Sequence, residues 1–426
     1  MRGALWLLAL FAMAVGAALF ATQSEGTVTL YWPPYRIDLS LNLVLLALLA
    51  LFVLLHLALC ALSALFELPA QAKQWRRDQR ELAMHANLQA ALGHQLAGRF
   101  SRARKLALQC VQHAGALQGS VPHTAQVRAL AHLLVAESAQ SLQDIALRDS
   151  HLQAALEVDL PSDAQHLRDG AALRATRWAL DDADPDAALN WLTRLSQGAQ
   201  RRTLALRFKL RGSQLAAHHG DALETARLLA KHGAFSGIAA QGLLRSLAQA
   251  NLAQMYDADQ LMRWWQSLPN VEKSMPDIAT RAAQRLCNLS AGQANAAALQ
   301  VTARQWIEPL WSQYLQLGES QRNQLLQAVE ASQPSLDASW LARIESAQRQ
   351  QPRDAPLQLL AGHTYMQRAL WGKAQQAFEA AIMGNNISPT DAARAWRGLA
   401  ALAEQRGDEV AAARAWKLSA TLTTPS

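Results

Sequence analysis

The sequence predicts an all-α protein in which a two-helix transmembrane hairpin is followed by an α-solenoid of stacked helical hairpins. Three observations predict this fold. Two long uncharged apolar runs bracket a short polar loop near the N-terminus. The remaining chain is rich in Ala, Leu, Gln and Arg, is poor in β-branched residues and shows no strand-like alternation. Small and aromatic residues recur in it at spacings typical of helical repeats.

Two membrane-spanning helices are predicted at the N-terminus. No charged residue occurs from Gly3 to Ser24 or from Leu39 to Phe66, and about 20 apolar residues span the hydrocarbon core of a bilayer. A cleaved signal peptide is the alternative for the first run, because Arg2 provides a minimal basic start. The predicted hairpin comprises residues 1–68, with helices over about 4–22 and 40–66 and an external loop over about 23–39.

The positions of the basic residues predict the orientation of this hairpin. Arg2 precedes the first run, and the loop holds Arg36 against two acidic residues. Four basic residues follow the second run, namely Lys73, Arg76, Arg77 and Arg80. Because cytoplasmic flanks carry the excess of Lys and Arg, we expect both termini in the cytoplasm and the loop outside. We also expect the four residues to lie on the anionic lipid surface, which makes membrane lipid a predicted partner.

Composition excludes several classes of function. The three cysteines, Cys60, Cys110 and Cys287, form no CxxC pair, which argues against a disulfide framework and a structural zinc site. The formal charge of +7 is compatible with binding to nucleic acid, but the sequence contains no nucleic-acid recognition motif. We therefore predict that nucleic acid is not a partner. The motifs GxGxxG, GxxxxGKS/T, HExxH and GxSxG do not occur. We therefore predict a non-catalytic protein with no metal and no catalytic residues.

The repeats are clearest near the C-terminus. One unit carries Gly362, Tyr365, Ala374, Phe378 and Ala381, and the next carries Trp396, Leu399, Gly407, Ala412 and Trp416 at equivalent offsets. This spacing matches the tetratricopeptide pattern, in which small residues let two antiparallel helices approach and aromatic residues fill the space between hairpins. A single hairpin cannot bury that face, so neighbouring hairpins are required.

These repeats divide the rest of the chain into three predicted regions. We expect about eight or nine helical hairpins in a tetratricopeptide-like α-solenoid over residues 80–426. The predicted regions are a basic juxtamembrane helix with the first repeat over 69–130, degenerate helical repeats over 131–350, and two tetratricopeptide repeats over 351–426.

Candidate binding residues follow from the repeat register. The first helix of each tetratricopeptide pair lines a groove. When Gly362 and Ala400 are aligned as equivalent positions, His363, Arg394 and Arg397 fall in this groove. Arg207, from an earlier repeat, is a fourth candidate. An arginine there could pair with the carboxylates of a partner. His56 in the second membrane run and His363 are also candidates for a haem contact, because histidine is a common axial ligand.

The N-terminal third resembles the proteobacterial HemY family. The resemblance lies in the two membrane helices, the loop residues Gly26–Leu30 and Tyr35–Ser40, the basic segment at Trp75–Arg77 and the first repeat at Ala97–Ala103. It covers about residues 1–130 well and the remainder as degenerate repeats. It implies a multi-pass bacterial inner-membrane protein associated with haem biosynthesis, but supplies no catalytic residues. The flavin-dependent protoporphyrinogen oxidase of the same name would need a Gly-rich dinucleotide turn, which this chain lacks.

These observations lead to one hypothesis and two alternatives. We predict an inner-membrane helical-repeat scaffold that organises late enzymes or intermediates of haem biosynthesis at the cytoplasmic face, with other proteins, including haem-biosynthesis enzymes, as partners. A general envelope-complex scaffold unrelated to haem is one alternative, because the repeats themselves specify no ligand. A direct porphyrin-binding carrier, with haem or porphyrin as its ligand, is the other. The scaffold itself requires no cofactor.

Overall fold

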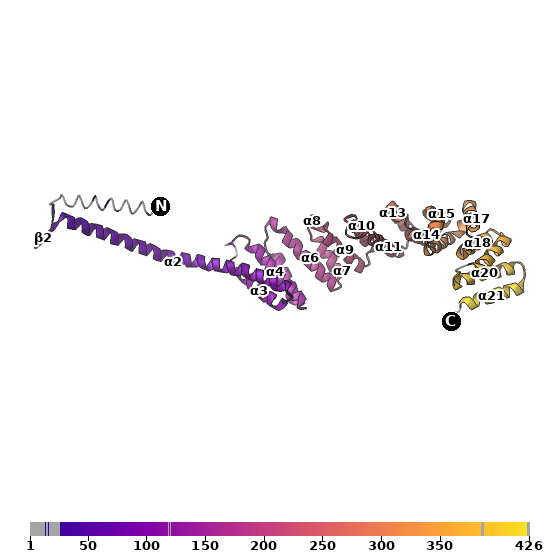
Figure 1. Cartoon of the computed structure of the whole chain (residues 1–426), viewed down its shortest axis with the longest axis horizontal. Helices are drawn as coiled ribbons and strands as arrows, with labels where there is room; N and C mark the ends of the chain where they lie inside the picture. The colour runs from indigo at the N-terminus through magenta and orange to yellow at the C-terminus, as the bar shows by residue number, and fades with distance from the viewer. Residues whose placement is uncertain are drawn as a thin grey trace. The chain divides into compact units, whose positions relative to one another are not determined.

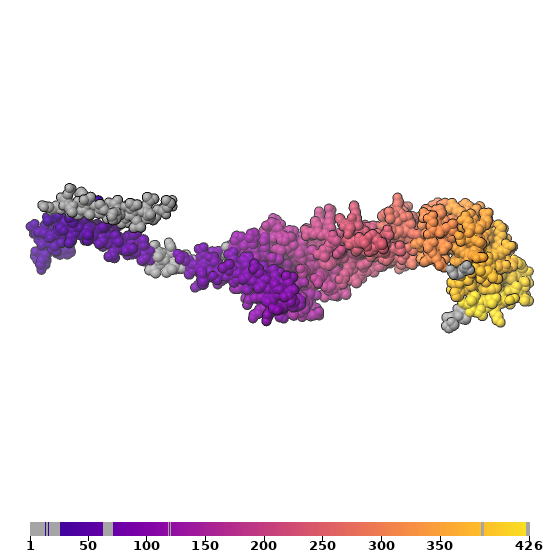
Figure 2. All heavy atoms as spheres, in the orientation of Figure 1, coloured from indigo at the N-terminus to yellow at the C-terminus, as the bar shows by residue number. Residues whose placement is uncertain are grey.

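The structure is a computed structural model of the 426-residue chain, and it describes residues 13, 16, 26–117, 119, 121–384 and 387–423, without the side chains of residues 63–70 (Figures 1 and 2). The first predicted membrane helix, over about residues 4–22, lies outside the described residues apart from Met13 and Gly16. The chain divides into two compact units, Met1–Ala171 and Ala172–Ser426.

From residue 26 onward, the first unit consists of two short strands followed by helices. Helix α6 contains the boundary between the two units. The elements are β1 (Thr27–Trp32), β2 (Tyr35–Ser40), α2 (Leu41–Leu96), α3 (Phe100–Ala116), α4 (Thr124–Ser141), α5 (Ile145–Glu157), the 3-10 turn η1 (Ser162–Ala164) and α6 (Gln165–Asp181).

The two strands form an antiparallel hairpin where the sequence predicted only a loop. Leu30 pairs with Ile37, and the register runs from the tight turn at Pro33–Pro34 to the end of β2. The serine that ends β2 also starts α2, because the hydroxyl of Ser40 accepts a hydrogen bond from the Leu43 amide at 3.4 Å. This N-cap satisfies one of the amides that a helix leaves without an internal partner.

Helix α2 runs without interruption for 56 residues (Figure 1). At 1.5 Å per residue this corresponds to about 84 Å. Its segment Leu41–Leu62 has a mean hydropathy of 3.0 and none of it is buried within the protein, so it is a candidate membrane span. The opposite end of α2 packs against α3 and α4. One helix therefore belongs to both the candidate span and the first repeat.

Small residues determine how α3 packs in the first unit. They recur at intervals of four, three and four residues, so they share one face of the helix. All four are fully buried, namely Ala103, Ala107, Cys110 and Ala114. The hydroxyl of Ser138 in α4 donates to the side chain of Gln95 in α2 at 2.7 Å, which connects the helices on either side of α3.

The second unit consists of helices and short 3-10 turns within the described residues. The elements are α7 (Pro185–Thr193), α8 (Gln197–Gln200), α9 (Thr203–Leu215), α10 (His219–Lys231), α11 (Gly237–Ala253), α12 (Ala258–Ser267), α13 (Asn270–Lys273), α14 (Pro276–Ser290), α15 (Ala296–Trp311), η2 (Tyr314–Gln316), α16 (Glu319–Ala331), η3 (Gln333–Ser335), α17 (Ala338–Gln350), α18 (Ala355–Gln367), α19 (Trp371–Met383), α20 (Pro389–Gln405) and α21 (Glu409–Thr423).

The helices of the second unit pack as successive hairpins. Helix α9 packs with α10, α14 with α15, α18 with α19, and α20 with α21. Contacts between alternate helices connect the pairs, because α11 touches α14, α14 touches α16, α16 touches α18, and α18 touches α20. A continuous apolar core runs through this array from Leu206 to Leu402. This architecture confirms the predicted tetratricopeptide-like helical-repeat fold.

The best repeat packs around the ring of Phe378. A Cβ added to Gly362 would lie 2.6 Å from this ring, and one added to Gly398 would lie 2.5 Å from it. Phe378 in α19 is fully buried between these two glycines, one from α18 and the other from α20. Glycine is needed at both positions because any side chain would occupy the space of the ring.

Candidate functional site

The candidate groove residues occupy three helices of the second unit. His363 lies in α18, Arg394 and Arg397 lie in α20, and Arg207 lies in α9. The structure brings His363 and Arg394 together, because both contact the carboxylate of Glu330 in α16. The sequence analysis did not identify Glu330, which is 33 residues from His363 and 64 from Arg394 along the chain.

Glu330 is the centre of a partly buried charged cluster. Its Oε1 atom lies 2.8 Å from His363 Nδ1 and also accepts a hydrogen bond from Arg394 Nη2. Arg394 Nη1 donates to Asp391 Oδ1 at 3.2 Å. The ring of His363 stands edge-on to that of Phe378, with 5.2 Å between centroids. The cluster therefore connects α16, α18 and α20 beside the glycine–phenylalanine contact.

The cluster shifts the ionisation of its members. Burial raises the pKa of the Glu330 carboxyl, but the hydrogen bonds from His363 and Arg394 outweigh it, so the pKa is lowered overall. Burial lowers the pKa of Arg394, but the hydrogen bonds and negative charges of Glu330 and Asp391 together outweigh it, so the pKa is raised overall. Glu330 is thus held as a carboxylate and Arg394 as a cation. Arg394 was predicted to pair with a carboxylate of a partner, but it pairs with Glu330 of the protein itself.

Arg397 and Arg207 lie apart from this cluster. Arg397 Nε donates to the Ala393 carbonyl at 3.4 Å within its own helix. Arg207 Nη2 donates to the Ala234 carbonyl at 3.4 Å, just after the end of α10. Both side chains are exposed at the surface. They remain candidates for binding, although the structure does not place them in one site with His363.

His56 makes local contacts within α2. Its Nε2 atom lies 3.6 Å from Cys60 Sγ, four residues along the helix, and its ring stacks with that of Phe52 at 6.4 Å between centroids. Residues four apart share one face of a helix, so these three side chains form one stripe on the candidate span. The haem contact suggested for His56 remains a prediction.

The basic segment forms one face of α2 beyond the candidate span. Its residues are spaced at intervals of three, one and three, which places them on the same side of a helix. All four are exposed, namely Lys73, Arg76, Arg77 and Arg80. This arrangement suits a role at an anionic lipid surface, which also remains a prediction.

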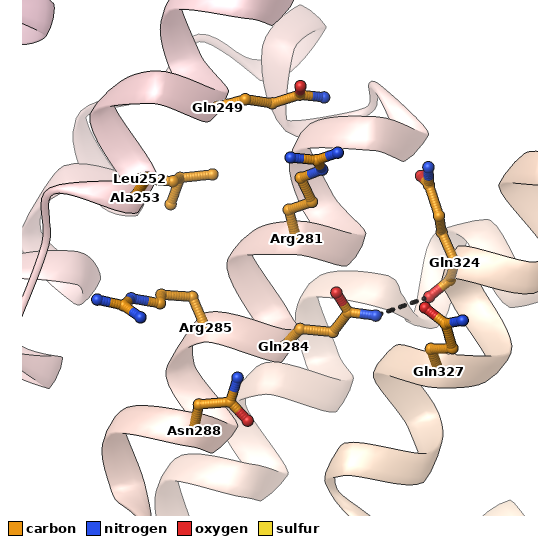
Figure 3. Close-up of a pocket in the computed structure, with 9 residues that line it drawn as sticks. All are labelled: Gln249, Leu252, Ala253, Arg281, Gln284, Arg285, Asn288, Gln324 and Gln327. Carbon is orange, nitrogen blue, oxygen red and sulfur yellow. Dashed lines mark hydrogen bonds between the residues drawn. The ribbon is translucent and has the colours of Figure 1, made fainter. Parts of the chain in front are cut away.

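A polar pocket of about 370 Å³ lies between α11, α14 and α16 (Figure 3). Such a volume is within the range of ligand sites. Its lining includes two arginines, five side-chain amides and no carboxylate: Gln249, Leu252, Ala253, Arg281, Gln284, Arg285, Asn288, Gln324 and Gln327. The pocket is therefore positively charged and rich in groups that both donate and accept hydrogen bonds.

The two arginines of the pocket differ in their partners. Arg285 donates to the Met255 carbonyl through Nε at 3.0 Å and through Nη2 at 2.7 Å, so it is committed to the end of α11. Arg281 is exposed, and within the described part of the chain its guanidinium has no hydrogen-bond or ion-pair partner. Asp277, one turn before it, instead pairs with Arg245 at 3.0 Å. Arg281 is therefore available to a ligand.

The amides of the pocket also include an unsatisfied group. Gln284 Nε2 donates to the main-chain carbonyl of Gln324 at 3.3 Å, as Figure 3 shows. The side-chain oxygen of Gln324 is buried and receives no hydrogen bond within the described residues. A buried acceptor without a donor costs about 1–3 kcal/mol. A ligand that donates to this amide would recover that free energy.

The sequence contains a signal for this pocket that the repeat analysis missed. In α14 the polar residues occur at intervals of three, one and three, namely Arg281, Gln284, Arg285 and Asn288. The opposite face of the same helix is buried and includes Ala279, Ala283 and Leu286. A polar stripe of this kind could have been identified from helical periodicity. Its neighbours on α11 and α16 could not, because they are distant in sequence.

The first unit contains a close pair of histidines. His132 in α4 and His151 in α5 approach to 2.9 Å between their Nδ1 atoms. Burial, His151 and Arg128 lower the pKa of His132 to about 4, and burial lowers the pKa of His151. Within the described residues, no group of three or more His, Cys, Asp or Glu side chains could hold a metal ion. The pair is therefore a neutral hydrogen-bonded contact at neutral pH.

Comparison with solved structures found matches of low similarity. The structure titled "Structure of Naa15/Naa10 bound to HypK-THB" matches at 12% identity and a TM-score of 0.24, covering 77% of this chain and 56% of that chain. The "Crystal structure of APC/C hetero-tetramer Cut9-Hcn1" matches at 14% identity and a TM-score of 0.25, covering 82% and 66%. This chain spans under two-thirds of the length of either matched chain. No curated protein matches the chain.

A family comparison gives a more specific result. The model described as "HemY protein N-terminus" matches residues 26–143. The matched range starts directly before β1 and ends directly after α4, so it includes the β-hairpin, α2 and the first repeat helices. Residues 26–143 are therefore similar to the HemY N-terminal region, which confirms the resemblance predicted from the sequence.

Proposed function

We propose that the protein is a non-catalytic scaffold that holds proteins or intermediates of late haem biosynthesis at the cytoplasmic face of a bacterial inner membrane. One observation carries the proposal: α2 joins a candidate membrane span to a helical-repeat unit within one uninterrupted helix. That helix lies inside the HemY N-terminal match. A tether of this kind raises the effective concentration of partners that share the same membrane surface.

The charge pattern of α2 supports the proposed orientation. The candidate span ends at Leu62, and the basic face from Lys73 to Arg80 follows on the same helix. By the positive-inside bias this flank is cytoplasmic, so the repeats that follow α2 lie in the cytoplasm. The proposed multi-pass topology requires the apolar run before the β-hairpin to span the membrane as well.

A tether variant tests the proposal in a deletion strain. Arg substitution of both Leu51 and Leu54, near the middle of the candidate span, should cost about 5–7 kcal/mol of membrane insertion. The matched control replaces the same two leucines with Ala. We expect the deletion strain to accumulate fluorescent porphyrin precursors and the wild-type and Ala chains to restore normal levels. The Arg chain should fail, because α2 would no longer hold its repeats at the cytoplasmic face.

The alternative functions give different results in the same strains. Normal porphyrin levels combined with an envelope defect would contradict the haem assignment and support a general envelope scaffold. A second measurement uses the detergent-solubilised chain purified from its native host. Co-purification of haem-biosynthesis enzymes without a chromophore supports the scaffold, whereas a stoichiometric Soret absorption band would support a porphyrin carrier.

A further inference from the structure

The pocket between α11, α14 and α16 has the chemistry of a ligand site. It has two guanidinium groups and no carboxylate in its lining, so a bound anion meets no like charge there. Arg285 is occupied by the Met255 carbonyl, and Asp277 is occupied by Arg245. The guanidinium of Arg281 is left to supply the charge-assisted hydrogen bonds that a carboxylate accepts, often through two parallel contacts.

The amides restrict the class of anion further. Gln324 lines the pocket, and its buried side-chain oxygen lacks a donor within the described residues. The terminal torsion of a glutamine is soft, so a ligand that donates a hydrogen bond can reorient this amide. A ligand that satisfies both Arg281 and Gln324 must therefore accept and donate hydrogen bonds. Inorganic phosphate and a porphyrin propionate supply mainly acceptors, whereas a peptide backbone supplies both a donor and an acceptor at every residue except proline.

The balance of polar and apolar lining excludes a large flat apolar ligand. Leu252 and Ala253 are the apolar members among nine lining residues, and the rest are arginines and amides. Ligand sites for apolar molecules are lined mainly by hydrophobic and aromatic side chains. The porphyrin ring is not matched by this surface, but an extended polypeptide segment is.

We propose that this pocket binds an extended peptide segment of a partner protein, with a carboxylate of the segment on Arg281 and a main-chain N–H on Gln324. The inference rests on the proposed scaffold function and specifies the chemistry of its partner. The carboxylate comes either from the partner's C-terminus or from an internal Asp or Glu. Both sources present the same group to Arg281, and the experiment separates them.

A peptide array with the full-length chain in detergent tests the proposal. Random decapeptides are synthesised with a free C-terminus, with a C-terminal amide, and with each Asp or Glu changed to its amide. We expect a set of binders that require one carboxylate. Loss of binding on C-terminal amidation assigns the site to chain ends, and loss on side-chain amidation assigns it to internal acidic residues.

Substitutions then locate the binding. Arg281→Gln should weaken binding about tenfold or more, because hydrogen bonds to charged groups contribute about 1.5–3 kcal/mol. Gln324→Leu should weaken it by about fivefold, in line with a neutral hydrogen bond. Arg263→Gln is the matched control, because Arg263 is an exposed arginine of α12 outside the pocket. Thermal unfolding of each variant checks that the fold is retained.

Three results would overturn the inference: no carboxylate-dependent binder in the array, unchanged binding by the Arg281→Gln chain, or equal weakening by the Arg263→Gln control. The proposed function is tested separately by porphyrin levels in the deletion strain. If Arg281→Gln abolishes peptide binding while the deletion strain has normal porphyrin levels, the peptide site is supported and the haem assignment is contradicted. If porphyrins accumulate but the Arg281→Gln chain binds peptides normally, the haem assignment is supported and the peptide site is contradicted.

Discussion

The packing of Phe378 between two glycines gives a sharp test of the repeat architecture. Gly398→Ala would place a methyl group 2.5 Å from the ring of Phe378, and Gly362 closes the opposite side, where an added Cβ would lie 2.6 Å from the ring. Carbon atoms in favourable contact are about 3.5–4.0 Å apart. The ring cannot withdraw by the missing distance, because it is fully buried and has Gly362 behind it.

Two opposing terms set the magnitude of the effect. Overpacking of a core costs about 1–3 kcal/mol, and replacing a helical glycine with alanine contributes about 1 kcal/mol of stabilisation. We therefore expect Gly398→Ala to destabilise the C-terminal repeats by up to about 2 kcal/mol. Gly242→Ala is the matched control, since Gly242 is exposed in the interior of α11 and a Cβ there meets no atom within 4 Å. The control should be neutral or stabilised.

Hydrogen–deuterium exchange is the suitable assay, because a multi-unit chain does not unfold as a single two-state system. Amides of α18, α19 and α20 should exchange faster in Gly398→Ala and at the wild-type rate in Gly242→Ala. Adding Phe378→Leu to Gly398→Ala should recover part of the protection by removing the clash. Protection of the α18–α20 amides at or above the wild-type level in Gly398→Ala would refute the packing argument.

Two further predictions concern ionisable groups. Desolvation and the charges of His151 and Arg128 lower the pKa of His132 to about 4. Between about pH 6.5 and pH 4 the His132 ring is therefore protonated in the unfolded chain but neutral in the folded chain. The first unit should therefore lose up to about 3 kcal/mol as the pH falls from 6.5 to 4, and His132→Gln should reduce this slope in exchange measurements. Glu330→Gln should destabilise the packing of α16, α18 and α20 by about 1–3 kcal/mol, because Arg394 would lose the carboxylate that it contacts. Unchanged amide exchange in these three helices would show that the cluster does not stabilise them.

The C-terminal repeat could be predicted from the sequence because its constraints are local. Gly362, Tyr365, Ala374 and Phe378 lie within one hairpin, so the spacing along the chain determines which of them meet. The structure adds Gly398 as the second glycine against the ring. Its role depends on how the next hairpin stacks, which the spacing within one repeat does not specify.

The polar contacts between repeats could not be predicted in the same way. His363 and Arg394 were assigned to a groove from the register of two units, and that register does place their helices side by side. Their acceptor, Glu330, comes from a third helix without a recognisable repeat motif. Whether an arginine faces a partner or an internal carboxylate is decided by such distant residues, and the pocket around Arg281 was missed for the same reason.

The length of α2 determines how far the proposed scaffold would hold its repeats from the end of the candidate membrane span. From residue 71 onward, where side chains are again described, Met84 is the first fully buried residue, and residues 71–80 are exposed. The candidate span ends at Leu62, 22 residues before Met84. These 22 residues of helix extend about 33 Å. A flexible linker of the same length would have a root-mean-square span of about 26 Å but would sample every shorter distance, including the lipid surface itself. A helical stalk instead holds the first repeat within a narrow range of distances from the end of the span, so partners would be captured near the membrane without the repeats lying on it.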